Sequence, residues 1–256
     1  MRIVHMSDLH LTKDGVPIWK TNTMDHFNKS IEIIRGMKNI DAIIVTGDIS
    51  DDGSDWTYRY ADSLFASLVI PAYLCPGNHD SLKMMLDKYK PSFYQVLPPS
   101  CNIGGWKLVM LNSVIPDDEN PNQNKARGFL SSESLNCIIQ ELEEGLQTII
   151  ALHHPPIEPG GWLNRKLLDN RDEFNTIVSY YPNARLVLYG HTHYFTDVRQ
   201  DYVRFSSSTS VGFAFDKELP KFQIADGLEG FSVIGIKRDT FNISNIRMGK
   251  QTTNVM

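Results

Sequence analysis

The sequence predicts an α/β fold of four layers, α/β/β/α, in which two mixed sheets lie face to face and helices cover their outer faces. Three observations favour this class. Short apolar runs alternate with helical patterns up to Tyr202, which is typical of a largely parallel central sheet. Beyond Tyr202, apolar runs follow one another without helices between them, which indicates a second, more antiparallel sheet. With 256 residues, the chain can also bury a substantial core,.

Strands are expected where apolar residues form short runs, because strands buried on both faces lack polar alternation. Two late segments, 203–215 and 230–248, are expected to lie in the second sheet. Since no linker or repeat interrupts the chain, one domain is expected over 1–256, with a ligand-bearing core (1–200) and a strand-rich part of the second sheet (201–256). The earlier strands are expected near 2–7, 42–46, 72–75, 107–113, 148–152 and 185–189.

Three helices are expected from apolar residues at helical spacing. The first covers 25–37,. The second begins at Ser54 or Asp55, both good capping residues, and continues to Leu68,. The third follows a serine pair and covers about 131–145,.

Composition limits the classes of function. The net charge is −5 and no basic patch stands out, so a nucleic-acid polymer is not an expected partner and a small phosphorylated substrate fits better. Three widely spaced cysteines suggest reduced thiols,. The first strand begins at Arg2, and no apolar run approaches the roughly 18 residues of a membrane span,. We therefore expect a cytoplasmic protein with no membrane partner, and a homo-oligomer is compatible with the sequence.

Five of the apolar runs end at clusters of aspartate, asparagine or histidine. Strands that carry polar residues at their carboxyl ends build one shared crevice in an α/β sheet. Because the clusters contain no cysteine ligand, they predict an oxygen-and-nitrogen site for first-row divalent metals. Each cluster begins within two residues of the end of its strand: Asp8-Leu9-His10, Gly47-Asp48, Gly77-Asn78-His79-Asp80, His153-His154-Pro155 and Gly190-His191-Thr192-His193.

Individual residue types suit different tasks at such a site. A carboxylate such as that of Asp48 has two oxygens and can bridge two cations, which one imidazole cannot do. Asn78 offers a neutral carbonyl oxygen. Asp8 and His10 are two residues apart, so both side chains can point to one side,.

In this order the five motifs resemble those of the calcineurin-like metallophosphoesterase superfamily, over 2–193. The resemblance implies that fold and a centre of two divalent metal ions, Fe, Mn or Zn. Asp48 would bridge the two metals. The other implied ligands are Asp8, His10 and His193 at the first metal and Asn78, His153 and His191 at the second.

The resemblance also implies hydrolysis by a metal-bound hydroxide that attacks phosphorus. His79 would face the phosphate as general acid or oxyanion stabiliser, and Asp48 would share in catalysis as the bridge. Two long loops, 115–127 and 155–171, are expected to shape the substrate pocket,. The residues expected to contact substrate are Asn78, His79, His193, His154 and Trp162.

Within the superfamily, the chain resembles the bacterial class III 3′,5′-cyclic-nucleotide phosphodiesterases, which implies a small phosphodiester substrate such as cyclic AMP. Asn164, Ser207 and Gly212, in segments expected to border the pocket, replace that group's usual Asp, Pro and Gln. Glycerophosphodiesterases share the ligands and remain an alternative. The segments that carry the resemblance are Gly128-Phe129-Leu130, Gly161-Trp162-Leu163-Asn164 with Leu168-Asp169-Asn170, Ser208-Thr209-Ser210-Val211 with Phe213, and Gly230-Phe231.

Structural interpretations compete with these roles. For His5, His26 and His154 a plain structural role is favoured. Since successive strand residues face opposite sides, only one of the adjacent histidines should bind a metal, and His154 should instead support a ligand or face the substrate. Asp80 is either a helix cap or a partner of a ligand imidazole. Trp162 could cover a nucleotide base or pack beneath its loop.

Other classes of function are disfavoured. A non-catalytic binding module of the same fold is opposed by the intact ligand set. A nuclease or protein phosphatase is opposed by the acidic balance and by the lack of appended basic or regulatory segments,.

Overall fold

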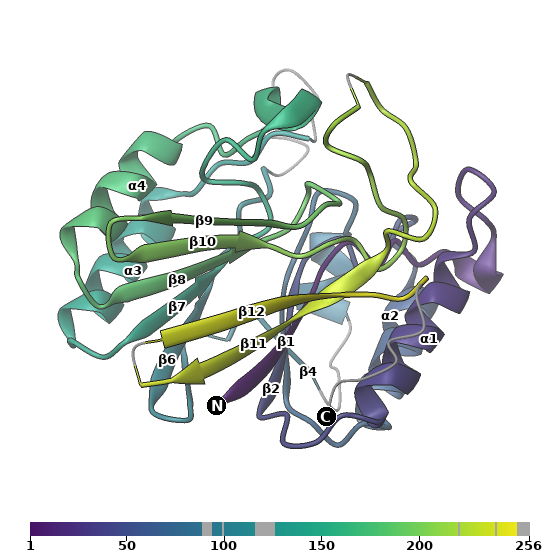
Figure 1. The fold of residues 1–256 in the computed structure, drawn as a ribbon, viewed down its shortest axis with the longest axis horizontal. Helices are drawn as coiled ribbons and strands as arrows, with labels where there is room; N and C mark the ends of the chain where they lie inside the picture. Colours follow the sequence, from purple (N-terminus) through teal and green to yellow (C-terminus); the bar gives the residue numbers. More distant parts are fainter. Residues whose placement is uncertain (89–93, 99, 116–125, 220, 239, 250–256) are drawn as a thin grey trace.

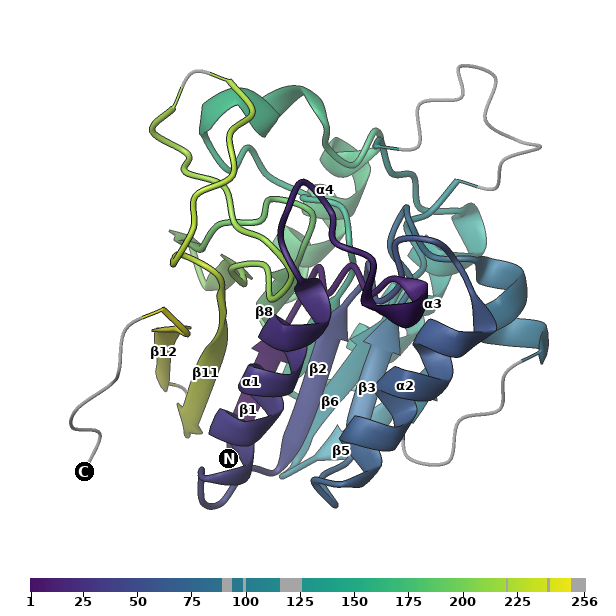
Figure 2. The same ribbon diagram turned by 90° about the vertical axis from the view of Figure 1, so that its right-hand side faces the viewer.

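Two six-stranded sheets lie face to face between two pairs of helices (Figure 1). The computed structural model describes residues 1–88, 94–98, 100–115, 126–219, 221–238 and 240–249. Helices α1 (Thr23–Arg35) and α2 (Asp55–Ala66) lie across the outer face of the first sheet, as Figure 2 shows. Helices α3 (Ser132–Glu143) and α4 (Arg171–Tyr180) cover the second sheet. The predicted four-layer fold class is confirmed.

The first sheet has a parallel centre and an antiparallel edge. Strands β1 to β4 run parallel, whereas β11 is antiparallel to both β1 and β12. The order across the sheet is β12 (Thr240–Arg247), β11 (Gly230–Lys237), β1 (Arg2–Met6), β2 (Ala42–Thr46), β3 (Ala72–Cys75) and β4 (Tyr94–Val96).

The second sheet is likewise parallel at its centre, where β6, β7, β8 and β10 lie side by side. It has an antiparallel strand at each edge. Its order is β5 (Cys101–Ile103), β6 (Trp106–Met110), β7 (Thr148–Ala151), β8 (Ala184–Tyr189), β10 (Val203–Ser207) and β9 (Thr196–Gln200).

This division corrects two expectations. The early strands do not form one central parallel sheet but are split between the two sheets. The strands of 201–256 do not belong to one sheet either, because β10 pairs with β8 while β11 pairs with β1. Apolar runs identify buried strands, but the choice of neighbour depends on contacts between residues far apart in the chain, which local patterns do not record.

Three apolar layers hold the four structural layers together. One lies between the first sheet and α1 and α2, with Phe27 and Phe65 at its centre. A second joins the other sheet to α3 and α4 through residues such as Ile138 and Phe174. The third, between the sheets, contains Ile44 and Leu188 among others. These layers leave the carboxyl ends of the parallel strands as the place where polar groups can gather.

The predicted helix starts are confirmed for α2 and α3, although only Ser131 makes a side-chain capping bond, accepting from the backbone N–H of Ser134. Helix α4 was not predicted, even though Phe174 and Val178 show its buried face at a spacing of four. Short helical turns also occur at Lys13–Gly15, Lys83–Lys88 and Gly161–Arg165. In the described part of the chain, no helix has the length and apolar character that a bilayer crossing requires.

Candidate metal centre

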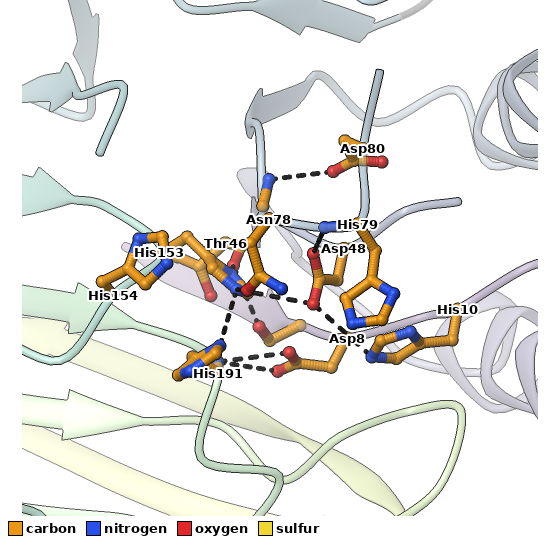
Figure 3. Close-up of polar contacts among 12 residues, drawn as sticks. Asp8, His10, Thr46, Asp48, Asn78, His79, Asp80, His153, His154 and His191 are labelled. Carbon is orange, nitrogen blue, oxygen red and sulfur yellow. Dashed lines mark hydrogen bonds and ion pairs between the residues drawn. The ribbon is translucent and has the colours of Figure 1, made fainter. Parts of the chain in front are cut away.

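The five polar clusters meet at one place between the two sheets, where the parallel strands end (Figure 3). The first sheet contributes residues after β1, β2 and β3, and the second contributes residues after β7 and β8. Except for the half-buried Asn78, the side chains expected to bind metal are buried. These are Asp8, His10, Asp48, Asn78, His153, His191 and His193.

Five of these residues have left-handed backbone conformations, with φ between 47° and 68°. Such a conformation costs a non-glycine residue on the order of 1 kcal/mol or more, and it persists where the surroundings enforce it. Here it turns the chain sharply after β1, β2 and β8, so that neighbouring side chains point into the same space. The five residues are Asp8, His10, Asp48, His191 and His193.

Two glycines make room for the cluster. A Cβ atom on Gly77 would overlap the carboxylate of Asp48, and one on Gly47 would collide with the ring of His153. Gly47 also has a φ of 88°, which favours glycine,. Gly47 and Gly77 therefore both permit close approach, and Gly47 also permits the sharp turn after β2.

One group of side chains consists of Asp8, His10 and His193, whose candidate ligand atoms lie within 4.8 Å of one another. The Nε2 atoms of His10 and His193 are 3.2 Å apart. Nε2 of His193 is also 3.4 Å from Oδ1 of Asp8. This group matches the residues expected at a first metal.

A second group lies beside it. Nε2 of His153 is 3.0 Å from Oδ1 of Asn78 and 3.2 Å from Nδ1 of His191. These three side chains come from β3, β7 and β8, so both sheets contribute.

Asp48 lies between the two groups. Its Oδ2 atom is 3.5 Å from Nε2 of His10 and 3.5 Å from Nε2 of His153. Its other oxygen, Oδ1, accepts a hydrogen bond from the backbone N–H of His79 at 2.8 Å. Burial raises the pKa of Asp48, but the surrounding imidazoles, with the protonated His79 among them, and the backbone N–H of His79 hold that pKa well below its usual value,. An ionised carboxylate with one oxygen equidistant from both groups is suited to bridge two cations.

The hydrogen bonds of the histidines show that the site fits metal ions. Nδ1 of His193 lies 2.7 Å from the carbonyl oxygen of Phe213, and Nδ1 of His10 lies 2.9 Å from a carboxylate oxygen of Asp51. Because these oxygens only accept, each Nδ1 donates, and in the neutral form of either ring its Nε2 presents a lone pair. Two such lone pairs at 3.2 Å repel each other unless a cation lies against both.

His153 shows the same arrangement in the second group. Its Nδ1 donates to the carbonyl oxygen of Thr46 at 2.7 Å, so its Nε2 faces the neighbouring ligand atoms as a lone pair. Burial lowers the pKa of His191 well below its usual value and that of His193 to about 4. Both imidazoles are therefore neutral, which is the form that binds metals.

His79 differs from these residues because its side chain is 44% exposed. Burial alone would lower its pKa, but the hydrogen bond to Asp51 and the charges of Asp48, Asp51 and Asp80 raise the pKa to about 9,. His79 also lines a cleft of about 490 Å³ beside the ligands. A protonated side chain in an open cleft can reach a substrate.

Asp80 fills neither of its expected roles. It accepts hydrogen bonds from the backbone N–H groups of Gly77, Ile49 and Ser50 and from the hydroxyl of Tyr58. It therefore ties the turn after β3 to the turn after β2. The pKa of Asp80 is raised to about 6, first by burial and then by the charge of Asp48.

Asp51 was not among the expected site residues. Its Oδ1 lies 2.9 Å from Nδ1 of His10 and 3.0 Å from Nδ1 of His79, so one oxygen serves both rings. Its position three residues after Asp48 carries no signal that separates it from an ordinary turn residue. The accepting carbonyls of Thr46 and Phe213 leave no mark in the sequence at all, because every residue has a carbonyl.

His154 lies against two of the proposed ligands, in agreement with the supporting role expected as one alternative. Its ring centre lies 4.9 Å from that of His153 and 5.0 Å from that of His191, and its Nδ1 lies 2.9 Å from the hydroxyl of Ser113. The alternation expected for successive strand residues fails because both histidines follow the end of β7.

The remaining expectations concern three side chains. His5 is buried, and its Nε2 atom lies 2.9 Å from the hydroxyl of Thr46. His26 binds the carbonyl oxygen of Gly212 through Nδ1 at 2.7 Å. Both have the structural roles that were favoured. The side chain of Trp162, like residues 116–125 of the first expected pocket loop, lies outside the described residues.

Known proteins with similar sequences support the interpretation of this geometry. The profile of the family described as calcineurin-like phosphoesterase matches residues 1–195. A 3′,5′-cyclic-nucleotide phosphodiesterase of Nostoc sp. (strain PCC 7120) is 29% identical over 242 residues, which cover 93% of this chain and 88% of that protein. The 3′,5′-cyclic adenosine monophosphate phosphodiesterase CpdA of Pseudomonas aeruginosa is 30% identical over 219 residues, covering 83% and 77%.

A solved structure shows the same fold. A dimetal phosphatase from Danio rerio superposes with a TM-score of 0.70 at 12% identity, over 98% of this chain and 96% of that one. The family profile covers most of the chain, including every strand-end cluster described above. The chain therefore belongs to the calcineurin-like phosphoesterase family, whose members use a dinuclear divalent metal centre, and it is a metal-dependent phosphoesterase.

Proposed function

We propose that this protein hydrolyses 3′,5′-cyclic nucleotides, with cyclic AMP as the foremost substrate. The position of Asp48 supports a two-metal reaction most directly, since one of its oxygens is 3.5 Å from a histidine of each group. The choice of substrate is supported by the relatives from Nostoc and Pseudomonas aeruginosa, which are named as cyclic-nucleotide phosphodiesterases.

The proposed ligands follow the two groups. Asp8, His10 and His193 would hold the first metal, Asn78, His153 and His191 would hold the second, and Asp48 would be shared by both. When bound, two such cations supply Lewis acidity and a nucleophilic water at neutral pH. Fe, Mn and Zn all suit nitrogen and oxygen donors, and metal analysis of the purified protein identifies which of them is bound.

The chain's own residues supply the rest of the reaction. Asn78 and His193 border the place where the phosphate binds, and the ring of His154 packs against His153 and His191 of the second group. His79 is held by Asp51 and keeps its proton at neutral pH because its pKa is raised to about 9. Opening a cyclic phosphodiester expels an alkoxide, and His79 donates a proton to that oxygen.

A panel of substrates tests the proposal. The protein is assayed with Mn²⁺ against cyclic AMP, cyclic GMP, a 2′,3′-cyclic nucleotide, glycerophosphoethanolamine and bis-p-nitrophenyl phosphate. We expect the highest kcat/KM for a 3′,5′-cyclic nucleotide and no turnover by the Asp48→Asn variant. A higher kcat/KM for glycerophosphoethanolamine than for every cyclic nucleotide would reject the proposal and favour a glycerophosphodiesterase.

A further inference from the structure

An exposed tryptophan lies at the tip of a tight turn after β1. Ile18 and Thr21 pair through two backbone hydrogen bonds of 3.0 and 2.8 Å, which leaves Trp19 and Lys20 at the two central positions. Both have left-handed conformations, with φ of 45° and 69°. Such turns normally use asparagine and glycine at these positions. A bulky aromatic residue here is strained, and strain of this kind concentrates at binding sites.

The Trp19 ring connects to the metal centre through one phenylalanine. Its centre lies 5.0 Å from that of Phe213, edge to face, and Phe213 lies 4.7 Å from His10 and 4.6 Å from His193. The second turn residue, Lys20, takes no part in these contacts. Only the ring of Phe213 therefore lies between Trp19 and two proposed ligands of the first metal, His10 and His193.

A second series of ring contacts also joins Trp19 to the metal centre. Phe215 stacks on His193 with a ring separation of 4.5 Å and an angle of 14°. Phe222 contacts both Phe215, at 5.0 Å, and Trp19, at 4.7 Å. We call the four residues Trp19, Phe213, Phe215 and Phe222 the aromatic wall.

The wall is buried at the metal centre and open at its outer end. Phe213 and Phe215 are 3% and 6% exposed, whereas Trp19 is 57% and Phe222 is 44% exposed. Ile18 already packs against the buried cluster beneath the turn, so burial of apolar surface does not require a strained tryptophan beside it. Figure 2 shows the segments that carry the wall, purple after β1 and yellow-green before β11, above the same end of the sheets.

We infer that Trp19 and Phe222 bind the heteroaromatic base of the substrate and that they set the preference for nucleotides. The inference rests on the proposed function. A phosphate held at the first group of ligands places its organic substituent within reach of the exposed rings. Every base has a π-face that stacks on an aromatic side chain, whereas the polar alcohols of glycerophosphodiesters have none. The wall flanks His10 and His193, while His79 approaches His10 from the side of the polar cleft, with 4.7 Å between the ring centres, so base binding and proton donation use different residues.

Substitutions within one turn test the inference. Trp19→Asn removes the ring and places a residue that favours the left-handed conformation, and Lys20→Gly relieves the neighbouring strain without touching the wall. We expect Trp19→Asn to raise KM for cyclic AMP at least about fivefold, the lower range for one lost stacking contact, with kcat within about twofold. Lys20→Gly should leave KM unchanged. Neither variant should lower the Tm, so a folding defect does not imitate the result.

A substrate without a base separates recognition from packing. Ribose 3′,5′-cyclic phosphate has the same reacting group, and its KM should be the same for wild type and Trp19→Asn. Trp19→Leu keeps an apolar side chain but no ring, so it should resemble Trp19→Asn with cyclic AMP. Equal losses on both substrates, or a wild-type KM for Trp19→Leu, would overturn the inference.

Direct binding provides a readout without turnover. A base stacked on Trp19 should quench tryptophan fluorescence when cyclic AMP is added, and Trp19→Phe should remove most of that quenching while retaining a Kd near that of wild type. Unchanged quenching in Trp19→Phe would contradict the inference. The proposed function fails in a different way: wild type would then not prefer cyclic nucleotides in the substrate panel, whatever residue stands at position 19.

Discussion

Asp51 holds His79 through a contact of 3.0 Å between Oδ1 and Nδ1. The same oxygen lies 2.9 Å from Nδ1 of His10, a proposed metal ligand. One carboxylate thus orients a metal-binding ring and also raises the pKa of the proposed proton donor. This arrangement links the metal centre to proton transfer, although Asp51 itself is assigned to neither metal.

Replacing Asp51 should shift the pH dependence of the reaction. A general acid works only while protonated, so activity is lost as pH rises through the pKa of His79, which is raised to about 9. In Asp51→Asn that pKa falls, and the alkaline limb of kcat should move to lower pH. The profile is measured at saturating metal, because lost support of His10 weakens metal binding by about 10–100-fold. Asp52→Asn is the matched control, since the carboxylate of Asp52 accepts hydrogen bonds from the backbone N–H groups of Lys13 and Ser54 and not from a histidine ring. An unshifted limb in Asp51→Asn would refute this role.

Removing His79 should impair chemistry while the metals stay bound. His79→Ala should retain both metals and lower kcat by about 10²–10⁴-fold, the range expected for lost acid catalysis. The loss should be smaller for bis-p-nitrophenyl phosphate, because p-nitrophenolate leaves without protonation. Metal analysis and kinetics with both substrates are the measurements. Loss of a metal ion would show instead that His79 is a ligand.

Removing the carboxylate of Asp48 should prevent both metal ions from binding. Asp48→Ala is expected to lose both metals and all hydrolysis, because one carboxylate contacts both groups of ligands. Metal content is measured after dialysis against a weak chelator, with Asp52→Ala as the control from the same turn. Two metals retained at wild-type affinity would exclude a bridging role.

His5 should make the fold sensitive to acid. Burial lowers its pKa to about 3 in the folded state, whereas the unfolded chain binds that proton near pH 6.5,. Because the unfolded state binds more protons between these values, the free energy of unfolding falls as pH drops through this window. Between pH 7 and 4.5, metal-free wild type should lose about 2–3 kcal/mol more than His5→Gln. Urea titrations at both pH values provide the test, and equal losses would show that His5 does not carry this effect.

The strand-end clusters were predictable because each is a local pattern. Apolar runs and the polar residues after them are adjacent in sequence, and parallel strands bring their carboxyl ends to one edge. Hence the side chains of Asp8, Asp48 and His153 were expected to meet, and the structure brings them together. The left-handed conformation of Asp8 and Asp48 was not predictable from these patterns, because only the crowded strand ends impose it.

Other features depend on contacts between distant segments. Strand β11 belongs to the first sheet because it pairs with β1, which lies more than 200 residues away in the chain. The role of Asp80 likewise depends on a turn about 30 residues earlier, which supplies the N–H groups of Ile49 and Ser50. From the sequence alone, an aspartate that links two turns cannot be distinguished from an aspartate that caps a helix.

The sequence by itself therefore determined the fold class, the expected ligand set and the family, because these are recorded in periodicity and in residue types at strand ends. Only the tertiary structure decided which strands share a sheet, that Asp51 serves two histidines, and that Trp19 stands one ring away from His10. The physical reason is that periodicity reports how each residue is buried, while these relationships arise from packing between segments that no local pattern connects.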